Sequence, residues 1–373
     1  MKNADVIIVG GGVIGCAAAY YLAKKGMQPV VVEKEEIGAG GSTRNGGGVR
    51  QSARDPREMP LALYGVRHLW PGLSDELGVD VEYIQKGNLR LGKTPAHMKK
   101  LEDIVKQGKE EGLELGIVSK EEVDEICPYV SDEVIGAIFC PTDGHANPLT
   151  TTLGYYKKAR ELGAQFITGD PVIEIELSRG RVKGVKAKAQ CFEAPKVLLA
   201  AAYESGLLVK PLGINVPMQN ILIEALITEE LPEMFPQMLG TAAADFYGHQ
   251  TKHGSFVFGG STGLEPFFLE DDHNLTRNKT APTICRAILG YFPWMKDVHI
   301  IRTWAGFKDQ MSDQIPILSE VDEIPGLYLA CGFTGHGFGI APSVGLLLSE
   351  LICEEETTFP ADVFHYDRFR PNK

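Results

Sequence analysis

Residues 4–15 read A-D-V-I-I-V-G-G-G-V-I-G. The first six form a short, β-branched run, which is typical of a fully buried parallel strand. Gly10, Gly12 and Gly15 follow in the spacing G-x-G-x-x-G. In such a turn the first glycine allows a sharp bend, the second lets the backbone approach a pyrophosphate, and the third lets helix and strand pack closely. This stretch therefore predicts a strand and turn that bind a dinucleotide.

The residues after the turn complete a β-α-β unit. A helical pattern runs from Cys16 to about Lys25 and stops at Gly26, and the apolar run 29–32 ends in Glu33. The N-terminus of such a helix offers free N–H groups to phosphate. The acid after the second strand would accept the hydroxyls of an adenosine ribose and repel a 2′-phosphate. Strand, turn, helix, strand and acid in this order predict a Rossmann-like unit.

Composition narrows the class of protein. With 373 residues the chain has room for two domains, and 37 basic against 49 acidic residues give a net charge of −12. Such a surface disfavours nucleic acid as a partner. The seven cysteines form no C-x-x-C pair, so we expect no metal site and reduced thiols in a cytoplasmic protein. The apolar residues 6–23 are interrupted by the glycines, which argues against a signal peptide or a membrane span.

A second glycine-rich segment favours FAD over NAD. Residues 36–50 read E-I-G-A-G-G-S-T-R-N-G-G-G-V-R. The glycines would let the backbone lie against a flat, bulky ring system, while Ser42, Thr43 and Arg44 would supply donors to phosphate. An NAD enzyme would normally continue into regular β-α-β units instead. For Arg44 and Arg50 the alternative is a solvated surface position.

The rest of the chain predicts a mixed α/β fold (α+β mixed). Helical spacing marks residues 101–112, 150–162 and 342–353, and strand patterns mark 218–227, 255–259 and 326–330. Residues 166–189 alternate like a meander with a turn at 178–180.

Because strands return late in the sequence, we expect a discontinuous, Rossmann-like FAD-binding domain. It would comprise residues 1–85, 145–215 and 315–373. A substrate-binding domain with a mixed or antiparallel sheet would comprise residues 86–144 and 216–314.

Five separated segments share a pattern with one known family. They are residues 38–48, 171–175 (P-V-I-E-I), 196–202 (K-V-L-L-A-A-A), 304–307 (W-A-G-F) and 332–339 (G-F-T-G-H-G-F-G). Together with the N-terminal motif they resemble the D-amino-acid oxidase superfamily of FAD-dependent oxidoreductases. Its members include sarcosine and glycine oxidases, hydrogen cyanide synthase subunits, and the β subunits of bacterial proline dehydrogenase and opine oxidase. After the third segment the chain departs from the family's A-G-A-W and reads A-Y-E-S.

The resemblance implies FAD as cofactor. Members that attach it covalently use a cysteine in the segment that corresponds to residues 306–309, where this chain has none, so we expect non-covalent binding. The residues expected to contact FAD are Gly10, Gly12, Val13, Ile14, Gly15, Glu33, Lys34, Gly41, Ser42, Thr43, Arg44, Gly46, Gly47, Gly48, Val172, Ala200, Ala201, Gly306, Gly332, Gly335, His336, Gly337, Phe338 and Gly339.

The G-H-G-F loop and two cations are the main candidates for chemistry. A helix N-terminus after the loop would stabilise the negative charge of a flavin that has accepted a hydride, a role that we favour over acid–base work by His336. A substrate carboxylate needs a fixed cation. Arg50 corresponds by spacing to a substrate-binding arginine of sarcosine oxidases, and Lys308 to an arginine of glycine oxidases. Sarcosine oxidases carry a lysine where this chain has Gly339, so the clamp copies no one subfamily.

Two further side chains are weaker candidates. Glu224 falls in the apolar run I-L-I-E-A-L, where it would either bind a cationic substrate side chain or face solvent on an edge strand. Tyr247 falls with His249 and His253 in a stretch that we expect to be a loop beside the site.

The predicted function is FAD-dependent oxidation of the C–N bond of an amino or imino acid. Hydride would pass from Cα to flavin N5, and the imine would be hydrolysed to an oxo acid. The substrate would be proline-like, sarcosine- or glycine-like, an opine, or a cationic amino acid such as arginine. One alternative is the FAD subunit of a dye-linked dehydrogenase complex, and another is an FAD-binding protein without turnover. Oxygen, a dye or quinone, or a partner subunit could accept the electrons, and homo- and hetero-oligomers both stay open.

Overall fold

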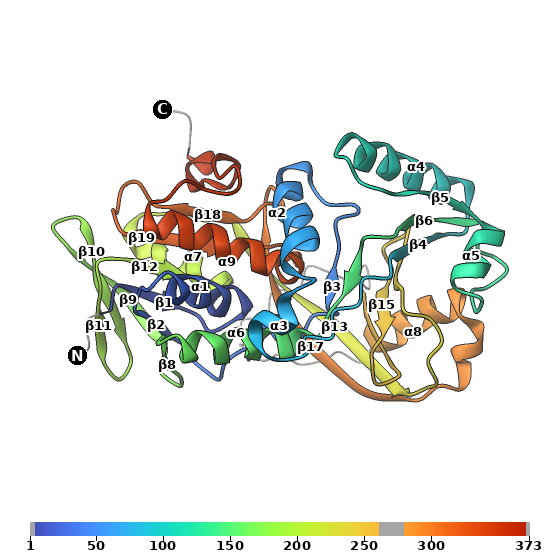
Figure 1. The fold of residues 1–373 in the computed structure, drawn as a ribbon, viewed down its shortest axis with the longest axis horizontal. Coiled ribbons are helices and arrows are strands. Elements are labelled where there is room, and N and C mark those ends of the chain that lie inside the picture. The colour runs from blue at the N-terminus through green and yellow to red at the C-terminus, as the bar shows by residue number, and fades with distance from the viewer. Residues whose placement is uncertain (1–3, 261–279, 371–373) are drawn as a thin grey trace.

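The computed structural model describes residues 4–260 and 280–370 and has a mixed α/β fold, as predicted (Figure 1). One sheet has six strands, which are parallel except where β18 meets β19. In spatial order they are β18 (Ile317–Glu320), β19 (Leu327–Cys331), β12 (Val197–Leu199), β1 (Val6–Val9), β2 (Pro29–Val32) and β8 (Gln165–Ile167).

The first sheet is buried on both faces, which explains the continuous apolar run of β1. Val6 and Ile8 join the core on one face, and Ile7 and Val9 join the core on the other. On the first face α1 (Val13–Lys24) packs against α9 (Gly337–Cys353) and α6 (Pro148–Glu161). The second face carries α7 (Tyr203–Val209) and an antiparallel sheet, whose strands are β9 (Val172–Ser178), β10 (Arg181–Ala187) and β11 (Cys191–Glu193).

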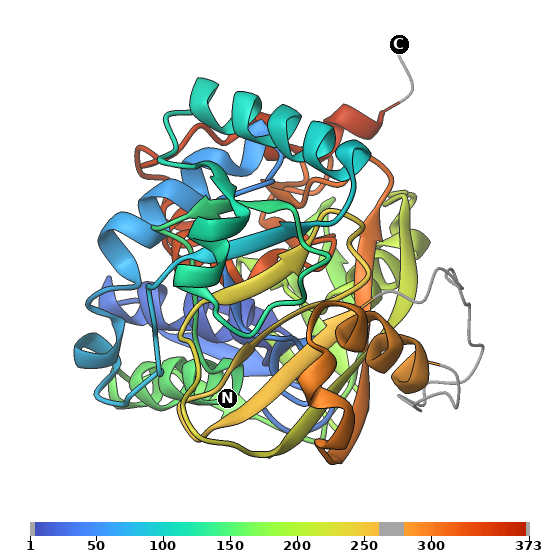
Figure 2. The ribbon, with the colours of Figure 1, turned by 90° about the vertical axis from the view of Figure 1, so that its right-hand side faces the viewer.

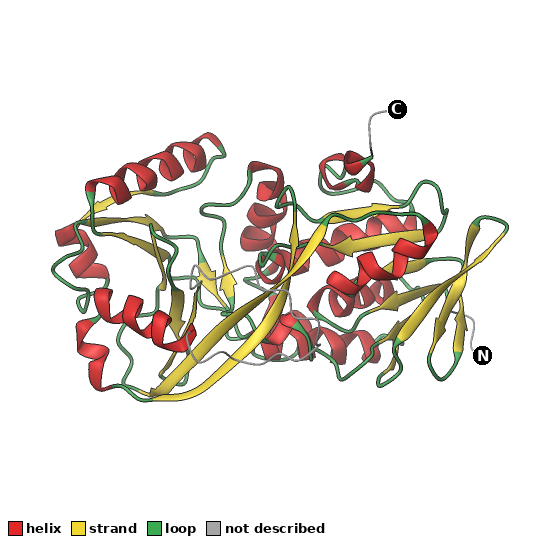
Figure 3. Cartoon of the chain, turned by 180° about the vertical axis from the view of Figure 1, so that it is seen from behind, coloured by secondary structure: helices red, strands yellow, loops and turns green. Residues whose placement is uncertain are grey.

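The second large sheet has eight strands and is mostly antiparallel. In spatial order they are β17 (Ile300–Met311), β13 (Met218–Glu230), β16 (Ser255–Gly260), β15 (Tyr247–Gln250), β14 (Met238–Thr241), β4 (Asn88–Gly92), β6 (Gly136–Cys140) and β5 (Gly116–Ser119). Its two longest strands, β13 and β17, run beside each other towards the six-stranded sheet (Figure 3). A short pair, β3 (Gly48–Val49) and β7 (Gly144–His145), stands apart.

Helices cover both faces of the second sheet at its β4–β6 end (Figure 2). Alternation along β6 separates the two cores, because Ala137 belongs to one and Ile138 to the other. The core with Ala137 is closed by α5 (Lys120–Ile126) and α8 (Thr280–Tyr291), and the core with Ile138 by α4 (Pro95–Glu110). In the part of the chain that the structure describes, the two remaining α-helices are α2 (Met59–Tyr64) and α3 (Leu73–Leu77).

Two helices begin earlier than their apolar spacing predicts, because capping residues set their start. Thr94 accepts a hydrogen bond from a backbone N–H of α4, and Asn147 does so for α6. Each cap is followed by a proline at the first helical position, where no N–H is needed.

The last helix differs most from its prediction. It begins at Gly337 rather than Pro342, so the glycine-rich loop itself forms the first turn. Pro342 is tolerated inside this helix. Among the described residues, no helix is long and apolar enough to cross a membrane.

The predicted meander is present in β9, β10 and β11, whereas β8, where its pattern starts, pairs with β2 in the six-stranded sheet. Arg179 and Gly180 have φ values of 53° and 76°, as a tight hairpin turn requires. The predicted division into two domains stays a prediction.

Candidate active site

The glycine turn after β1 is built by close backbone approach. A Cβ on Gly10, whose φ is +110°, would lie 2.4 Å from the carbonyl oxygen of Ala200 at the end of β12. A Cβ on Gly15 would lie 2.0 Å from the carbonyl oxygen of Gly10. Any side chain at these two positions would separate β1 from β12 or α1 from the turn, so the sequence admits only glycine there.

A first cavity opens at this turn. Its wall combines the N-terminus of α1, the glycine-rich segment, β17 and the N-terminus of α9. Glycine occupies five of the lining positions, so backbone forms much of the wall. The lining residues that carry the argument are Gly12, Val13, Ile14, Gly41, Ser42, Arg44, Ala200, Gly306, Gly335, Gly337 and Phe338.

Two polar side chains contact the glycine motif directly. Ser42 Oγ accepts a hydrogen bond from Val13 N over 2.9 Å, and a Cβ on Gly12 would lie 2.8 Å from that oxygen. Glu33 Oε2 accepts from Gly11 N over 2.6 Å. The predicted acid and hydroxyl therefore lie at the N-terminus of α1, where a helix attracts phosphate.

Other predicted cofactor residues hold the walls in place. Thr43 Oγ1 donates to the carbonyl of Gly38. Gly46 leaves room for the Tyr247 ring, since a Cβ there would lie 2.5 Å from it.

Gly47, with φ +69°, lies beside the carbonyl of Ala146, and Gly48 pairs with His145. These contacts fix the path of the glycine-rich segment along the cavity.

The N-terminus of α9 points between two cavities. His336 is its N-cap residue, and Gly335 before it has φ +81°. Gly337 lines the first cavity, Gly339 lines the second, and Phe338 lines both. The unpaired N–H groups and the positive dipole end of a 17-residue helix therefore face the site.

A second cavity adjoins the first and is rich in cations. Arg50, Arg54, Arg90 and Lys308 all line it. Its other wall comes from β14, β15 and the residues between them, including Met238, Gly240, Thr241, Phe246 and Tyr247.

Both predicted clamp residues thus lie at the second cavity. Arg50 Nη1 donates to the carbonyls of Ser52 and Ala53 at 2.7 and 3.2 Å. Burial, together with the charges of Arg54 and Arg90, lowers the pKa of Arg50 to about 9.

Arg54 is a site residue that the sequence interpretation missed. Its Nε donates to the carbonyl of Arg50, its Nη1 to Glu58 over 3.1 Å, and its Nη2 to the carbonyl of His336 over 3.2 Å. The Arg54–Glu58 ion pair is almost wholly buried. The i,i+4 spacing of the two residues was the available signal. This pair ties the Arg50 segment to the start of α9.

His336 is half-buried beside the same carboxylate. Its Nδ1 lies 3.4 Å from Glu58 Oε2. Burial lowers the pKa of His336 to about 4, against the opposing effect of Glu58. The imidazole is therefore neutral near pH 7, which suits a positioning role better than proton transfer.

Asp309 is a second residue that sequence reasoning missed. It lines the first cavity next to Lys308, and its Oδ2 accepts from Gly332 N over 2.6 Å. Burial raises the pKa of this carboxyl to about 6. The hydrogen bond from Gly332 N to Asp309 places the predicted residue Gly332 behind the wall of the first cavity rather than on it.

Tyr247 and His249 lie in strand β15, so the predicted loop is wrong for both. The stretch Tyr-Gly-His-Gln lacks apolar alternation, and pairing with β14 and β16 holds it extended. Tyr247 lines both cavities, and burial raises its pKa.

Glu224 is 5% exposed on β13, between β17 and β16. The alternative of an exposed edge-strand position is therefore wrong. Its neighbour Ile223 lines both cavities, and since side chains alternate along a strand, Glu224 points to the opposite face.

Nine predicted cofactor residues lie off the walls of both cavities: Gly10, Gly15, Glu33, Lys34, Thr43, Gly47, Val172, Ala201 and Gly332. Lys34 pairs with Glu204 at 2.7 Å on the surface. Ala201 N donates to Ser205 Oγ, and Val172 belongs to the three-stranded sheet.

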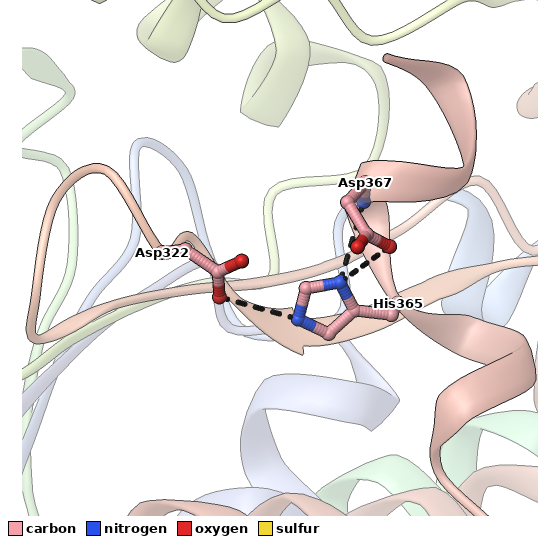
Figure 4. A group of neighbouring side chains, drawn as sticks. All are labelled: Asp322, His365 and Asp367. Carbon is pink, nitrogen blue, oxygen red and sulfur yellow. Dashed lines mark hydrogen bonds and ion pairs between the residues drawn. The ribbon is translucent and has the colours of Figure 1, made fainter. Parts of the chain in front are cut away.

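A possible metal-binding group lies elsewhere. Near the C-terminus the His365 ring lies between two carboxylates, 3.4 Å from Asp322 and 2.7 Å from Asp367 (Figure 4). Arg370 also contacts Asp322. These contacts, together with the hydrogen bond from Tyr366 N to Ser319 Oγ, fasten the C-terminal segment to β18.

Comparisons with known proteins identify the family and the fold. Residues 5–351 match the family model DAO, described as FAD dependent oxidoreductase. Sarcosine oxidase subunit beta from Arthrobacter sp is 30% identical over 308 residues, which are 81% of this chain and 75% of the relative. L-Proline dehydrogenase from P. horikoshii superposes with a TM-score of 0.91 at 28% identity, over 99% of this chain and 98% of that one. Glycine oxidase from Geobacillus kaustophilus has a TM-score of 0.92 at 23% identity over the full length of both chains. The chain belongs to the DAO family of FAD-dependent oxidoreductases.

Proposed function

We propose that the protein oxidises the C–N bond of an amino or imino acid, with the flavin in the first cavity and the substrate in the second. The observation that carries the proposal is that the two cavities share part of their walls. The shared residues are Asn45, Ile223, Tyr247, Lys308, Gly335 and Phe338. A substrate held by the cations of the second cavity would therefore lie against the flavin.

The first cavity fits FAD. The α1 N-terminus with Ser42 and Glu33 would hold the adenosine diphosphate half, and glycine backbone at 41, 306 and 335 would face the ring. When bound there, FAD would supply the hydride acceptor. No cysteine lines either cavity in the part of the chain that the structure describes, which supports non-covalent binding.

Side chains of this chain would do the rest. Arg50 and Lys308 would bind the substrate carboxylate, while Tyr247, Ile223 and Phe338 would exclude water from the reacting carbon. The α9 N-terminus would stabilise negative charge on the adjoining ring edge. Because His336 is half-buried and lies beside the carboxylate of Glu58, we assign no proton transfer to it.

The names of the relatives support the substrate class. Sarcosine oxidase, L-proline dehydrogenase and glycine oxidase are each named for an amino or imino acid. One of them is named as a subunit. That observation favours a second candidate, in which the chain is the FAD subunit of a complex and passes electrons to a partner rather than to oxygen.

An anaerobic titration of the purified flavoprotein tests the proposal. The panel holds L- and D-proline, sarcosine, glycine, L-arginine and an opine, and the flavin absorbance is followed. Bleaching by one of them supports C–N oxidation, and reoxidation by air or only by a dye separates the two candidates. Iminodiacetate is tested in the same way. If neither iminodiacetate nor any amine of the panel bleaches the flavin of a protein that carries FAD, the proposed function is wrong.

A further inference from the structure

We infer that the substrate carries two carboxylates and that Arg90 binds the one farther from the flavin. This inference rests on the proposed function and narrows its substrate class. Lys308 lines both cavities, whereas Arg90 lines only the second. A molecule that spans from one cation to the other therefore needs an anionic group at each end.

The position of Arg90 on β4 directs it into the cavity. Leu89 and Leu91 on either side are fully buried in the core beneath the sheet. Since side chains alternate along a strand, Arg90 and Asn88 share the opposite face, and both line the second cavity. The guanidinium is thus placed on the cavity wall by the register of the strand.

Arg90 has no partner within the described residues. No hydrogen bond or ion pair joins its guanidinium to them, although burial is sufficient to lower its pKa. A desolvated guanidinium presents five N–H donors and is costly to leave unpaired. A carboxylate ligand would satisfy these donors in a bidentate pair.

The nearby acids are already engaged by other groups. Glu58 is paired with Arg54. Asp143 lies close enough to affect Arg90, but its oxygens accept from Gln51 N, from the Ser52 hydroxyl and from Asn88 Nδ2. Neither carboxylate forms an ion pair with Arg90.

Charge counting supports the same conclusion. Among the described residues that line the second cavity, Arg50, Arg54, Arg90 and Lys308 are cationic, and no aspartate or glutamate lines it. A substrate with two carboxylates would therefore match the charge of this lining better than a substrate with one. A cationic side chain, such as that of arginine, would be repelled.

Two carboxylates without a nitrogen, one with two carboxylate groups and one with a single group, test the anion subsite apart from turnover. Oxydiacetate has the shape of iminodiacetate with an ether oxygen in place of the amine, and methoxyacetate is its single-carboxylate counterpart. Each is titrated into the FAD-loaded protein, and the dissociation constant is read from the shift of the flavin spectrum. We expect oxydiacetate to bind about 10- to 100-fold more tightly, as for a charged hydrogen-bonded pair.

Three variants locate the subsite. Arg90→Gln should remove most of the preference and leave methoxyacetate binding unchanged, while Arg90→Lys should keep part of it. Arg67→Gln, at an exposed position on the surface, should behave like the unmodified protein. The flavin content and melting temperature of each variant confirm that it is folded. If Arg90→Gln does not fold, Arg90→Lys is used to test the subsite in its place.

Bleaching of the flavin is then compared for sarcosine, iminodiacetate, L-aspartate and D-aspartate. This comparison shows which carbon skeleton between the two carboxylates the site accepts. Equal affinity for oxydiacetate and methoxyacetate in the unmodified protein overturns the inference, and so does a preference that survives Arg90→Gln. If no amine bleaches the flavin while the oxydiacetate preference persists, C–N oxidation is wrong but the second anion subsite is supported.

Discussion

The indole Nε1 of Trp304 donates a hydrogen bond to the backbone carbonyl of Arg44 over 2.9 Å. The Arg44 guanidinium donates in turn to the carbonyl of Ala305 over 3.2 Å. Gly306 makes this exchange possible, because a Cβ there would lie 3.0 Å from Arg44 Cβ. The glycine-rich segment is thereby fixed to β17 across the first cavity.

Trp304→Phe should weaken FAD binding about 2- to 10-fold, since one neutral hydrogen bond that orders the cavity wall is lost. The dissociation constant follows from flavin fluorescence during titration of the apoprotein. Trp294→Phe is the matched control, because its Nε1 has no acceptor within the described residues. Equal affinity of the Trp304 variant and the control would contradict a role for this bond.

Arg54→Gln should lower the free energy of unfolding by about 3–5 kcal/mol, because it leaves the carboxylate of Glu58 buried without its partner. Urea unfolding of the FAD-loaded protein measures the change. Arg57→Gln breaks an exposed ion pair with Asp55 and should cost less than about 1 kcal/mol. Similar losses for both variants would show that the buried pair contributes no more than a surface one.

Ala202→Gly should stabilise the protein by on the order of 1 kcal/mol. Ala202 has φ 50° and ψ −127°, which is costly for a residue with a Cβ. It lies where the family pattern A-G-A-W is interrupted. Thermal unfolding compares it with Ala201→Gly, whose backbone has no positive φ and which should be neutral or destabilising. A lower melting temperature for the Ala202 variant would mean that its methyl group packs usefully.

His336→Asn should flatten the pH dependence of stability. The pKa of His336 falls from 6.5 to about 4 on folding, so the unfolded chain binds the extra proton and stability is lost as the pH falls from about 6.5 towards 4. Between pH 7 and pH 5 the unmodified protein should lose about 2 kcal/mol more than the variant. Unfolding free energies at these pH values measure this difference, and parallel profiles would show that folding does not shift the pKa of His336.

The N-terminal unit was predictable because its signals are local. Gly10, Gly15 and Glu33 lie within one β-α-β segment. Gly15 and Glu33 each contact another residue of that segment, and Gly10 contacts the residue that follows the adjoining strand β12. The carboxyl end of the sheet was also recognisable, since the G-H-G-F loop keeps its spacing. The helix that follows this loop was predicted to begin at Pro342, although it begins at Gly337. The helix propensity of glycine carries no information about a helix dipole that faces a cavity.

The cation cluster was only partly predictable. Arg50 and Lys308 were found by spacing, but Arg54 depends on His336, which lies 282 residues away. Arg90 becomes a site residue only through the register of β4 against β14. Tyr247 was predicted to lie in a loop because the residues of β15 lack apolar alternation. Pairing with β14 and β16 keeps this segment extended. Such features arise from pairing over long sequence distances, which a single sequence does not reveal.

The neighbours of β1 have a consequence for how the protein is made. Of the six strands of its sheet, β1 leaves the ribosome first and its neighbour β2 follows soon after, but its other neighbour β12 comes from residues 197–199, and β19 beyond it from residues 327–331. The face of α1 that packs on α9 stays uncovered for longer, because α9 is complete only when residue 353 has been synthesised. During most of translation the chain therefore exposes an apolar strand and helix, the state that chaperones recognise. A chain cut short before α9 would keep that face bare and would be a substrate for proteolysis rather than a smaller flavoprotein.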